Sequence, residues 1–398
     1  MNILSLSTCP LDPTLGSGKT RLRWSEGLRA LGHSCEMVEP IAYETWHGQS
    51  RALRFRQALG ACKFVHERLS AGAYDLVEFF GGEFGLATWL LSRKPERPLV
   101  VAHTDGLELL AAERERAYNP PTSGRQYVRA WFASQTHDRL SRAAFVNADA
   151  FVTGCALDRE YVLRLGLYPQ HRTAVVEPGL DPEYLAMPFI AEKEERIAYT
   201  GSWGARKGVR LLCRVMSRVL KQRPSLKFDV FGTGGQRGDV LTCFPAEWHD
   251  RIVVYAKLST QELAARLAQT KIFFFPTQYE GFGMALSEAM ACSCAPITTR
   301  TGFGATLRDG EEALLTEFED ADAMEQAIVS LLDDEERRRR VARAAWERVR
   351  SLSWEANIAK LAELYQVWTA EHRQLLSRRL GRPAHAFRAK LGDSARGR

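Results

Sequence analysis

The sequence has 398 residues, of which 45% are hydrophobic and 26% are charged. This length fits two domains, and the composition excludes a collagen-like, disordered or disulfide-scaffold chain. The net charge is +6, and residues 371–398 account for all of it, with eight Lys or Arg against two acids. The rest of the chain is about neutral, so no nucleic-acid surface is expected.

Cysteine usage and the N-terminus predict a cytoplasmic protein. The eight cysteines show no CxxC pair and no zinc-ligand spacing, and most lie in apolar stretches where buried thiols are expected. Residues 1–6 resemble a first strand and not a signal peptide, and no apolar run approaches the roughly 20 residues of a membrane helix. The basic tail at 381–398 raises the hypothesis of a peripheral contact with anionic lipid on the inner face of the membrane, or with an acidic acceptor.

In the first half of the chain, short apolar runs alternate with helical patterns. An early helix places Trp24, Leu28 and Leu31 on one face, and Gly32 is expected to end it. This alternation predicts a parallel sheet covered by helices. Strands are expected at residues 3–7, 35–39, 75–80, 98–103, 149–154 and 173–177.

The same pattern restarts after a charged join near residues 182–195. A helix with Leu211, Leu212, Val215 and Val219 on one face follows the first strand of this second half. Two similar α/β halves are therefore predicted. Strands are expected at residues 196–201, 227–232, 251–256, 271–276, 295–299 and 313–316.

The last hundred residues have helical patterns. Helices are expected at 321–332 and 335–350, and a third begins after Ser353, a favourable N-cap residue. The apolar face of the third helix carries Trp354, Ile358, Leu361, Tyr365 and Trp368. The predicted divisions are an N-terminal domain (1–185), a C-terminal domain (186–352), a helix packing back toward the N-terminal domain (353–380) and the basic tail.

A glycine-containing motif, Gly16-Ser-Gly-Lys-Thr20, follows the first strand. It resembles a phosphate-binding loop, but Pro13 stands where that motif needs its first glycine, and proline has no N–H to offer a phosphate. Two interpretations stay open: a strand-to-helix turn that lines a ligand cleft, and a plain turn.

The strongest chemical signal lies after the strand predicted at 271–276. A loop carries Glu280, Gly281 and Gly283, and a helix that begins near Met284 contains Glu288. Free N–H groups at a helix start favour a phosphate, glycines let a ligand approach the backbone, and carboxylates can bind sugar hydroxyls. A sugar joined to a ribose through a diphosphate uses all three features.

This stretch resembles the E-x7-E signature of family 4 retaining glycosyltransferases. The segment 199–208 resembles that family's Gly-Arg…Lys-Gly loop, with Lys207 at the diphosphate-binding lysine and Ser202 where the arginine is usual. Residues 176–181 resemble its interdomain segment, and the strand ending at His103 resembles the one whose histidine faces the donor sugar. The resemblance implies an α/β fold of two Rossmann-like domains that face each other across a cleft (GT-B), with C-terminal helices.

The family resemblance also implies an activity: transfer of a sugar from a nucleotide-sugar donor to a glycan, lipid-linked or small-molecule acceptor, with retention. The nucleotide-sugar is a substrate, and neither a cofactor nor a metal is expected. The catalytic residues it implies are Glu280, Lys207 and His103. The donor-binding residues it implies are Glu288, Gly281, Phe282, Gly283, Met284, Ala285, Arg206, Ser202, Gly16 and Gly18.

Other interpretations of these residues remain open. Glu288 could be a structural carboxylate, Glu280 a helix cap, Lys207 a surface lysine and His103 a packing histidine. Two other functions use the same architecture: a nucleotide-sugar epimerase, and a non-catalytic sugar-nucleotide-binding protein. Asp105 and Glu83 are candidates for acceptor contacts or for plain turn residues, and the base of the nucleotide is expected near residues 254–257.

Overall fold

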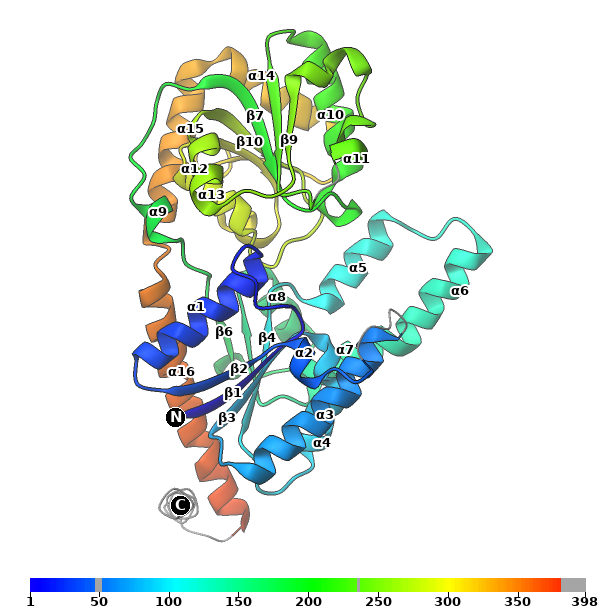
Figure 1. Cartoon of the computed structure of the whole chain (residues 1–398), viewed down its shortest axis with the longest axis vertical. Coiled ribbons are helices and arrows are strands. Elements are labelled where there is room, and N and C mark those ends of the chain that lie inside the picture. Colours follow the sequence, from blue (N-terminus) through cyan, green and yellow to red (C-terminus); the bar gives the residue numbers. More distant parts are fainter. Residues whose placement is uncertain (47–51, 235–236, 381–398) are drawn as a thin grey trace. The chain divides into compact units, whose positions relative to one another are not determined.

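The computed structural model describes residues 1–46, 52–234 and 237–380, and the chain divides into two compact units (Figure 1). The first unit contains residues 1–154 and 158–177 together with the described part of 354–398. The second contains residues 155–157 and 178–353. The predicted basic tail at 381–398 lies outside the described residues.

Each unit is built on one six-stranded sheet. The first sheet contains β1 (Asn2–Ser7), β2 (Ser34–Val38), β3 (Leu76–Phe80), β4 (Leu99–Thr104), β5 (Ala150–Thr153) and β6 (Thr173–Val175). The second contains β7 (Glu194–Thr200), β8 (Lys227–Phe231), β9 (Ile252–Tyr255), β10 (Thr270–Phe275), β11 (Ala295–Thr299) and β12 (Leu314–Thr316). Each of these strands overlaps a strand predicted from the sequence, so the twelve strand predictions are confirmed.

Helices connect the strands throughout. Before residue 178 they are α1 (Gly16–Ala30), α2 (Pro40–Tyr43), α3 (Leu53–Ala71), α4 (Gly85–Ser92), α5 (Glu108–Tyr118), α6 (Gly124–Ala133), α7 (Arg139–Val146) and α8 (Ala156–Arg164). After it they are α9 (Pro182–Leu185), α10 (Val209–Gln222), α11 (Arg237–Leu241), α12 (Thr260–Ala268), α13 (Met284–Ala291), α14 (Ala321–Asp333), α15 (Glu335–Arg348) and α16 (Trp354–Leu380). Within the described part of the chain, no helix combines the length and the apolar character that a membrane span requires.

Both sheets are entirely parallel. The strand order is β2-β1-β3-β4-β5-β6 in the first and β12-β11-β10-β7-β8-β9 in the second. Parallel strands need helical crossovers, and the helices bury both faces of the sheet, which explains why the strands have continuous apolar runs. In β10, for example, the side chains of Phe273, Phe274 and Phe275 are at most 1% exposed. Burying each of them stabilises the fold by about 1.5–3 kcal/mol.

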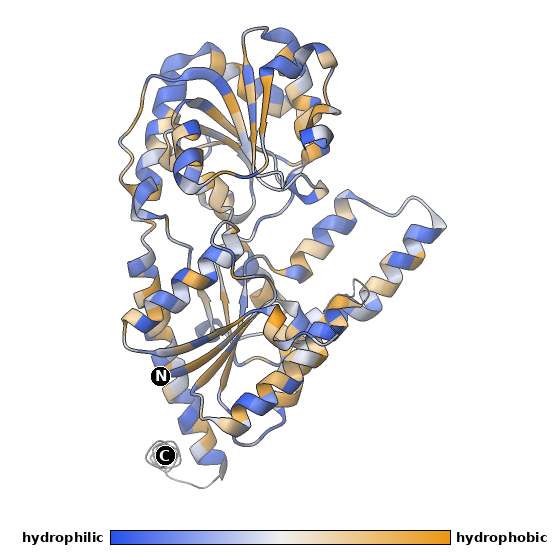
Figure 2. Cartoon of the chain, viewed as in Figure 1, coloured by the Kyte–Doolittle hydropathy of each residue, from blue (hydrophilic) through white to orange (hydrophobic). Residues whose placement is uncertain are grey.

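The helices form layers on the two faces of each sheet (Figure 1). In the first unit, α1 and α16 pack together on one face, and α3, α4 and α7 pack together on the other. In the second unit, α10 packs with α14, and α13 packs with α12 and α15. Figure 2 shows the hydrophobic colouring concentrated in the strands of both sheets. Each unit is therefore a three-layer, Rossmann-like domain.

The first unit contains both ends of the described chain, because the C-terminal helix α16 packs on it. The apolar face predicted for this helix is confirmed, since Trp354, Ile358, Leu361, Tyr365 and Trp368 are each at most 5% exposed. The helix comes very close to α1: a Cβ placed on Gly27 would lie 2.3 Å from Ile358 Cδ1.

One detail of the first helix differs from the prediction. Trp24 and Leu28 are buried as expected, whereas Leu31 is 50% exposed. The reason is that α1 ends at Ala30, so Leu31 is already the C-cap residue and turns away from the buried face. Gly32, with a φ of +83°, stops the helix as predicted.

Candidate active site

In the second sheet, the neighbouring strands β7 and β10 are followed by loops that lead in opposite directions. The chain passes from β7 to β8 and β9 on one side, and then crosses back to β10 on the other side of β7. The carboxyl ends of β7 and β10 therefore lie side by side, and their loops turn to opposite faces of the sheet. Such a switch point is where ligands bind in open α/β sheets.

The loop after β7 is attached to the loop after β10 through backbone atoms. It contains a turn of 3-10 helix at Ala205–Lys207, and Gly208 follows with a φ of +70°. A Cβ on Gly208 would lie 1.8 Å from the carbonyl oxygen of Pro276, so only glycine permits this contact. In addition, the Gln278 N–H donates to the Arg206 carbonyl oxygen at 2.9 Å.

This attachment brings two of the predicted catalytic residues together. Lys207 Nζ lies 2.6 Å from Glu280 Oε1, and the two side chains are 15% and 9% exposed. The Thr277 hydroxyl donates to the same carboxylate oxygen at 2.7 Å, and the Glu280 N–H donates to Thr301 Oγ1 at 2.9 Å. The ammonium group also lies 5.3 Å from the centroid of the Phe275 ring. Lys207 is therefore a partly buried, paired cation and not a surface lysine.

The helix α13 begins directly after this loop, as predicted. Its N-cap is Gly283, with a φ of +94°, and no side chain caps it, so Glu280 is not the cap residue. The preceding backbone is packed tightly against the loop after β11: a Cβ on Gly302 would lie 2.4 Å from the Phe282 carbonyl oxygen. The first turn of α13 thus combines an uncapped helix start with the positive end of the helix dipole.

Glu288 lies in the second turn of α13 and is 8% exposed. Its charge acts on Tyr184 of α9: burial raises the pKa of that phenol, and the nearby Glu288 carboxylate raises it further. Gly281, Phe282, Met284 and Ala285 belong to the same continuous segment. The structure thus brings Lys207, Glu280, Glu288 and the start of α13 together in one unit.

Ser202 and Arg206 are exposed in the loop after β7. The Tyr199 hydroxyl donates to the Ser202 carbonyl oxygen at 2.9 Å, and burial followed by the charge of Glu280 raises the pKa of Tyr199. Arg206 contributes its carbonyl oxygen to the contact with Gln278 and Thr277. Both residues are therefore held in this loop through hydrogen bonds to their carbonyl oxygens.

The other predicted site residues belong to the first unit. His103 is 1% exposed, and its ring contacts Trp24 and Phe80. Its Nε2 atom lies 3.3 Å from Glu78 Oε2 and 2.5 Å from the hydroxyl oxygen of Tyr365 on α16. Burial alone would raise the pKa of Glu78, but hydrogen bonding to His103 and Tyr365 lowers it. In this arrangement His103 holds α16 to the sheet.

Gly16 and Gly18, which the sequence placed in a loop after the first strand, lie in the first turn of α1. Gly16 is the first residue of α1 and is exposed, whereas Gly18 is buried. A Cβ on Gly18 would lie 2.4 Å from the Asp12 carbonyl oxygen, so this glycine lets residues 10–12 fold back against the helix.

A cluster of charged side chains occupies the carboxyl edge of the first sheet. Arg21, which is almost fully buried, lies 2.7 Å from Asp105, and Glu83 lies 3.5 Å from Arg54. Glu108, which the sequence analysis did not select, accepts a hydrogen bond from Gly82 N–H at 2.9 Å. Burial, and then the negative charge of Glu83, raises the pKa of Glu108 from 4.5 to about 7. The only sequence signal for it was its place soon after the strand predicted at 98–103.

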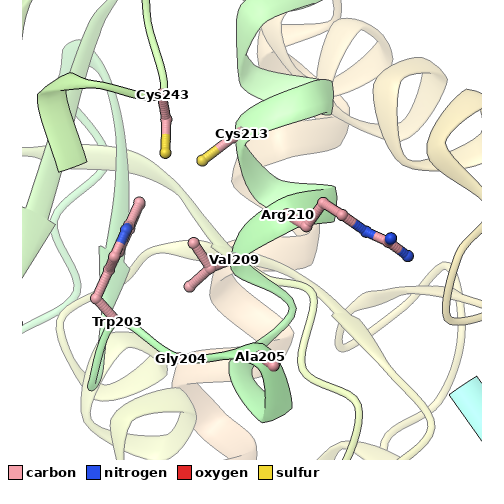
Figure 3. Close-up of a pocket in the computed structure, with 7 residues that line it drawn as sticks. All are labelled: Trp203, Gly204, Ala205, Val209, Arg210, Cys213 and Cys243. Atoms are coloured by element: carbon pink, nitrogen blue, oxygen red, sulfur yellow. The ribbon is translucent and has the colours of Figure 1, made fainter. Parts of the chain in front are cut away.

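A separate pocket of about 460 Å³ lies behind the loop after β7 (Figure 3). In Figure 3 the thiols of Cys213 and Cys243 point toward each other, while Arg210 points away. Lys207, Glu280 and Glu288 do not line this pocket, so it is distinct from the residues assembled at the switch point. Its lining residues are Trp203, Gly204, Ala205, Val209, Arg210, Cys213 and Cys243.

The single Asp-x-Asp triplet of the sequence, Asp320-Ala-Asp322, has structural contacts. Asp320 caps α14 by accepting from the Ala323 N–H at 2.9 Å, and Asp322 pairs with Arg218 at 2.5 Å. In residues 1–46, 52–234 and 237–380, no group of three or more His, Cys, Asp or Glu side chains is arranged to hold a metal ion.

Comparison with known proteins shows which families and folds the chain is similar to. Residues 182–348 match the family model described as "Glycosyl transferases group 1". This part of the chain is therefore similar to group 1 glycosyltransferase domains. The matched range runs from α9 to α15 and includes the switch-point residues Lys207, Glu280 and Glu288.

Similar proteins cover more of the chain. The D-inositol 3-phosphate glycosyltransferase of Corynebacterium glutamicum (strain R) is 26% identical over 368 residues, which are 86% of this chain and 83% of that protein. Together with the domain match, this likeness supports a glycosyltransferase.

Solved structures establish the fold. Sucrose-phosphate synthase from Thermosynechococcus elongatus aligns with a TM-score of 0.71 at 20% identity, over 93% of this chain and 100% of that one. HepE from Anabaena, solved in complex with UDP, aligns with a TM-score of 0.61 at 14% identity, over 92% and 100%. The chain has the GT-B fold, with two Rossmann-like domains.

Gly208 provides a test of how the two loops of the site are joined. The Gly208→Ala variant is expected to lose about 2–4 kcal/mol of stability, because it combines a left-handed backbone with a clash against Pro276. Gly310 has a similar φ of +77° but open space around it, so Gly310→Ala is expected to lose only about 1–2 kcal/mol. Calorimetric melting of both variants measures the difference, and equal losses would contradict the contact.

Glu108 predicts a pH dependence of stability. Because its pKa is raised to about 7 in the folded protein, the folded state binds more protons than the unfolded state, and stability falls as pH rises from about 4.5 to 7. Glu108→Gln should remove this dependence and raise stability at pH 8, by on the order of 2 kcal/mol. Urea unfolding at pH 5 and pH 8 measures the effect, with Glu115→Gln on the exposed side of α5 as control. Equal pH dependence in wild type and Glu108→Gln would refute it.

Proposed function

We propose that the chain is a retaining, metal-independent glycosyltransferase. It moves a sugar from a nucleotide-sugar donor to a glycan, lipid-linked or small-molecule acceptor. The observation that carries the proposal is the Lys207–Glu280 pair at the switch point, 2.6 Å apart, beside the uncapped start of α13. The group 1 domain match over residues 182–348 supports the same activity.

The roles follow from the chemistry of each group. The Lys207 ammonium has three N–H donors, and Glu280 accepts from one of them, so donors remain for the oxygens of a diphosphate. The N–H groups at the start of α13, near Met284 and Ala285, add a positive helix dipole for the same anion. Glu280 binds hydroxyls of the transferred sugar, and Glu288 binds the ribose hydroxyls.

The catalytic contribution is electrostatic. In the transfer, the bond between the anomeric carbon and the diphosphate oxygen breaks, and the acceptor oxygen bonds to the same face of that carbon. The acceptor proton passes to the departing diphosphate. Negative charge on the leaving group grows in the transition state, so a fixed ammonium and fixed N–H dipoles lower the barrier.

Several finer assignments belong to this proposal. Gly16 and Gly18 contribute backbone to the donor site, and Ser202 and Arg206 flank the diphosphate. The hydrogen bonds that hold the carbonyl oxygens of Ser202 and Arg206 in the loop after β7 support the last point. The predicted contact of His103 with the donor sugar is not part of this proposal, because its side chain is 1% exposed and hydrogen-bonded to Tyr365. The base contacts backbone at residues 254–257. The UDP complex of HepE makes UDP the first nucleotide to test. A further part of the proposal is that the tail at 381–398 contacts anionic lipid.

Substitution of Lys207 tests the leaving-group role. Lys207→Ala is expected to reduce kcat by about 10²–10³-fold, as loss of one transition-state donor does. Release of nucleoside diphosphate from an active nucleotide-sugar is the measurement, with the exposed Lys221→Ala of α10 as control. Because the change leaves Glu280 without its cation, the melting temperature of each variant is recorded. A folded Lys207→Ala with wild-type kcat would refute the role.

Substitution of Glu288 tests the ribose-binding role. Thermal shift with UDP, GDP, ADP and CDP first identifies the nucleotide, since a ligand of the folded state raises its melting temperature. Glu288→Ala should then weaken the binding of that nucleotide by about 10–100-fold, because hydrogen bonds to a charged group are lost. Unchanged affinity would contradict the assignment. Turnover of a nucleotide-sugar without any acceptor would favour an epimerase, and binding without turnover would favour a non-catalytic protein.

A further inference from the structure

The exposed apolar side chains of this protein are unevenly distributed. Among the described residues, every large hydrophobic side chain found exposed belongs to the first unit. Four of them lie within six consecutive residues of α6: Tyr127, Val128, Trp131 and Phe132 are 60%, 67%, 64% and 55% exposed. The helix α6 has no buried residue. The fold therefore does not need these side chains for its own core.

The four side chains share one face of α6. Tyr127 and Trp131 are four residues apart, as are Val128 and Phe132, and at 3.6 residues per turn the four cover an arc of about 140°. Figure 1 shows α5 and α6 extending away from the first sheet, and Figure 2 shows hydrophobic and hydrophilic residues alternating along α6. The apolar face lies on a projecting helix and not in a groove.

Positive charge flanks the apolar face on one side. Arg125 and Arg129 are exposed next to Phe132 on the helix surface, and α6 contains no acidic residue. Neither arginine has an ion-pair partner in the part of the chain that the structure describes. The continuing segment to residue 146 adds Arg139, Arg142 and a single acid, Asp138, which pairs with Arg116 at 2.7 Å.

We propose that α6 is a membrane-docking helix, whose apolar face enters the interface of an anionic lipid surface. Helices that lie in a bilayer interface combine Trp and other apolar residues on one face with Lys or Arg beside them. Tyr and Trp favour the headgroup level because their rings are apolar and their tips are polar. Arginine attracts anionic headgroups. The apolar face of α6 would therefore contact the acyl chains, and Arg125 and Arg129 would contact the headgroups.

A second copy of the chain is a poorer partner. A two-fold interface would place the same face of α6 against itself, with Arg125 and Arg129 at its edge and no acid on the facing helix to pair with them. Such an interface would use the apolar side chains but would leave the flanking positive charge without a complement. The proposal is independent of the tail at 381–398 and of the glycosyltransferase activity, because it depends only on α6.

Co-sedimentation of the full chain with lipid vesicles tests the proposal. The wild type should pellet with vesicles of equimolar phosphatidylcholine and phosphatidylglycerol, and much less with phosphatidylcholine alone. The variant Trp131→Ser with Phe132→Ser should bind at least about tenfold more weakly, because two large apolar side chains no longer enter the interface. The matched control changes two exposed residues of α16, Val367→Ser with Leu375→Ser, and should bind as wild type does.

The charge requirement is tested in the same assay. Arg125→Gln with Arg129→Gln should weaken binding to the anionic vesicles by about 10–30-fold and reduce its salt sensitivity. Two exposed cations of α10, changed as Arg214→Gln with Lys221→Gln, are the control and should have no such effect. Circular dichroism melting confirms that the variants fold, which is expected because α6 has no buried residue.

Three results would overturn the proposal. Both α6 variants could pellet as the wild type does. Removal of residues 381–398 could abolish binding while the α6 variants keep it, which would assign the contact to the tail. Finally, analytical ultracentrifugation could show a dimer that the Trp131 and Phe132 changes dissociate, with no lipid binding, which would make a second copy the partner.

Discussion

The ion pair between Lys207 and Glu280 depends on the way that the second sheet is connected. The two residues are 73 positions apart, and they meet because β7 and β10 are parallel neighbours whose carboxyl ends lie at the same edge. Both side chains are largely buried, so each charge needs the other: removal of one partner from a buried pair typically costs about 3–5 kcal/mol. The pair thus ties a chemical site to the central strands of the domain.

The site also needs backbones that approach more closely than side chains allow. Gly208 admits the Pro276 carbonyl oxygen, and Gly302 admits that of Phe282, so the loops after β7, β10 and β11 are in backbone contact. Gly283 supplies the left-handed turn from which α13 starts. These glycines leave the helix start without a capping side chain, and they fix the positions of Lys207 and Glu280. Rigid loops of this kind suit electrostatic catalysis, which requires groups that are in place before the reaction begins.

The sequence predicted the strands of both sheets well, because burial on both faces shows in the residues of each strand itself. Strands buried on both faces must be short apolar runs, and such runs appear between residues with turn or helical patterns. The start of α13 was also predictable, since Gly281 and Gly283 follow a buried strand and come directly before the apolar helical segment that contains Glu288. The sequence could not show that Lys207 pairs with Glu280 or that Glu108 is buried beside Glu83, because those facts depend on tertiary packing. Likewise, the pattern around His103 gave no sign of its contact with Tyr365, which is 262 residues away.

The helices of residues 108–146 were the largest omission, and the reason is informative. Periodicity predicts a helix when one face is buried, but α5 buries only Leu110 and α6 buries nothing. A segment of this kind is not selected for the stability of its own unit. It connects β4 to β5, where a single crossover helix would suffice. Loops and insertions at the carboxyl ends of parallel strands are where proteins of one fold differ in function. The match to the group 1 glycosyltransferase model lies in the second unit, whereas α5 and α6 belong to the first unit and lie outside it.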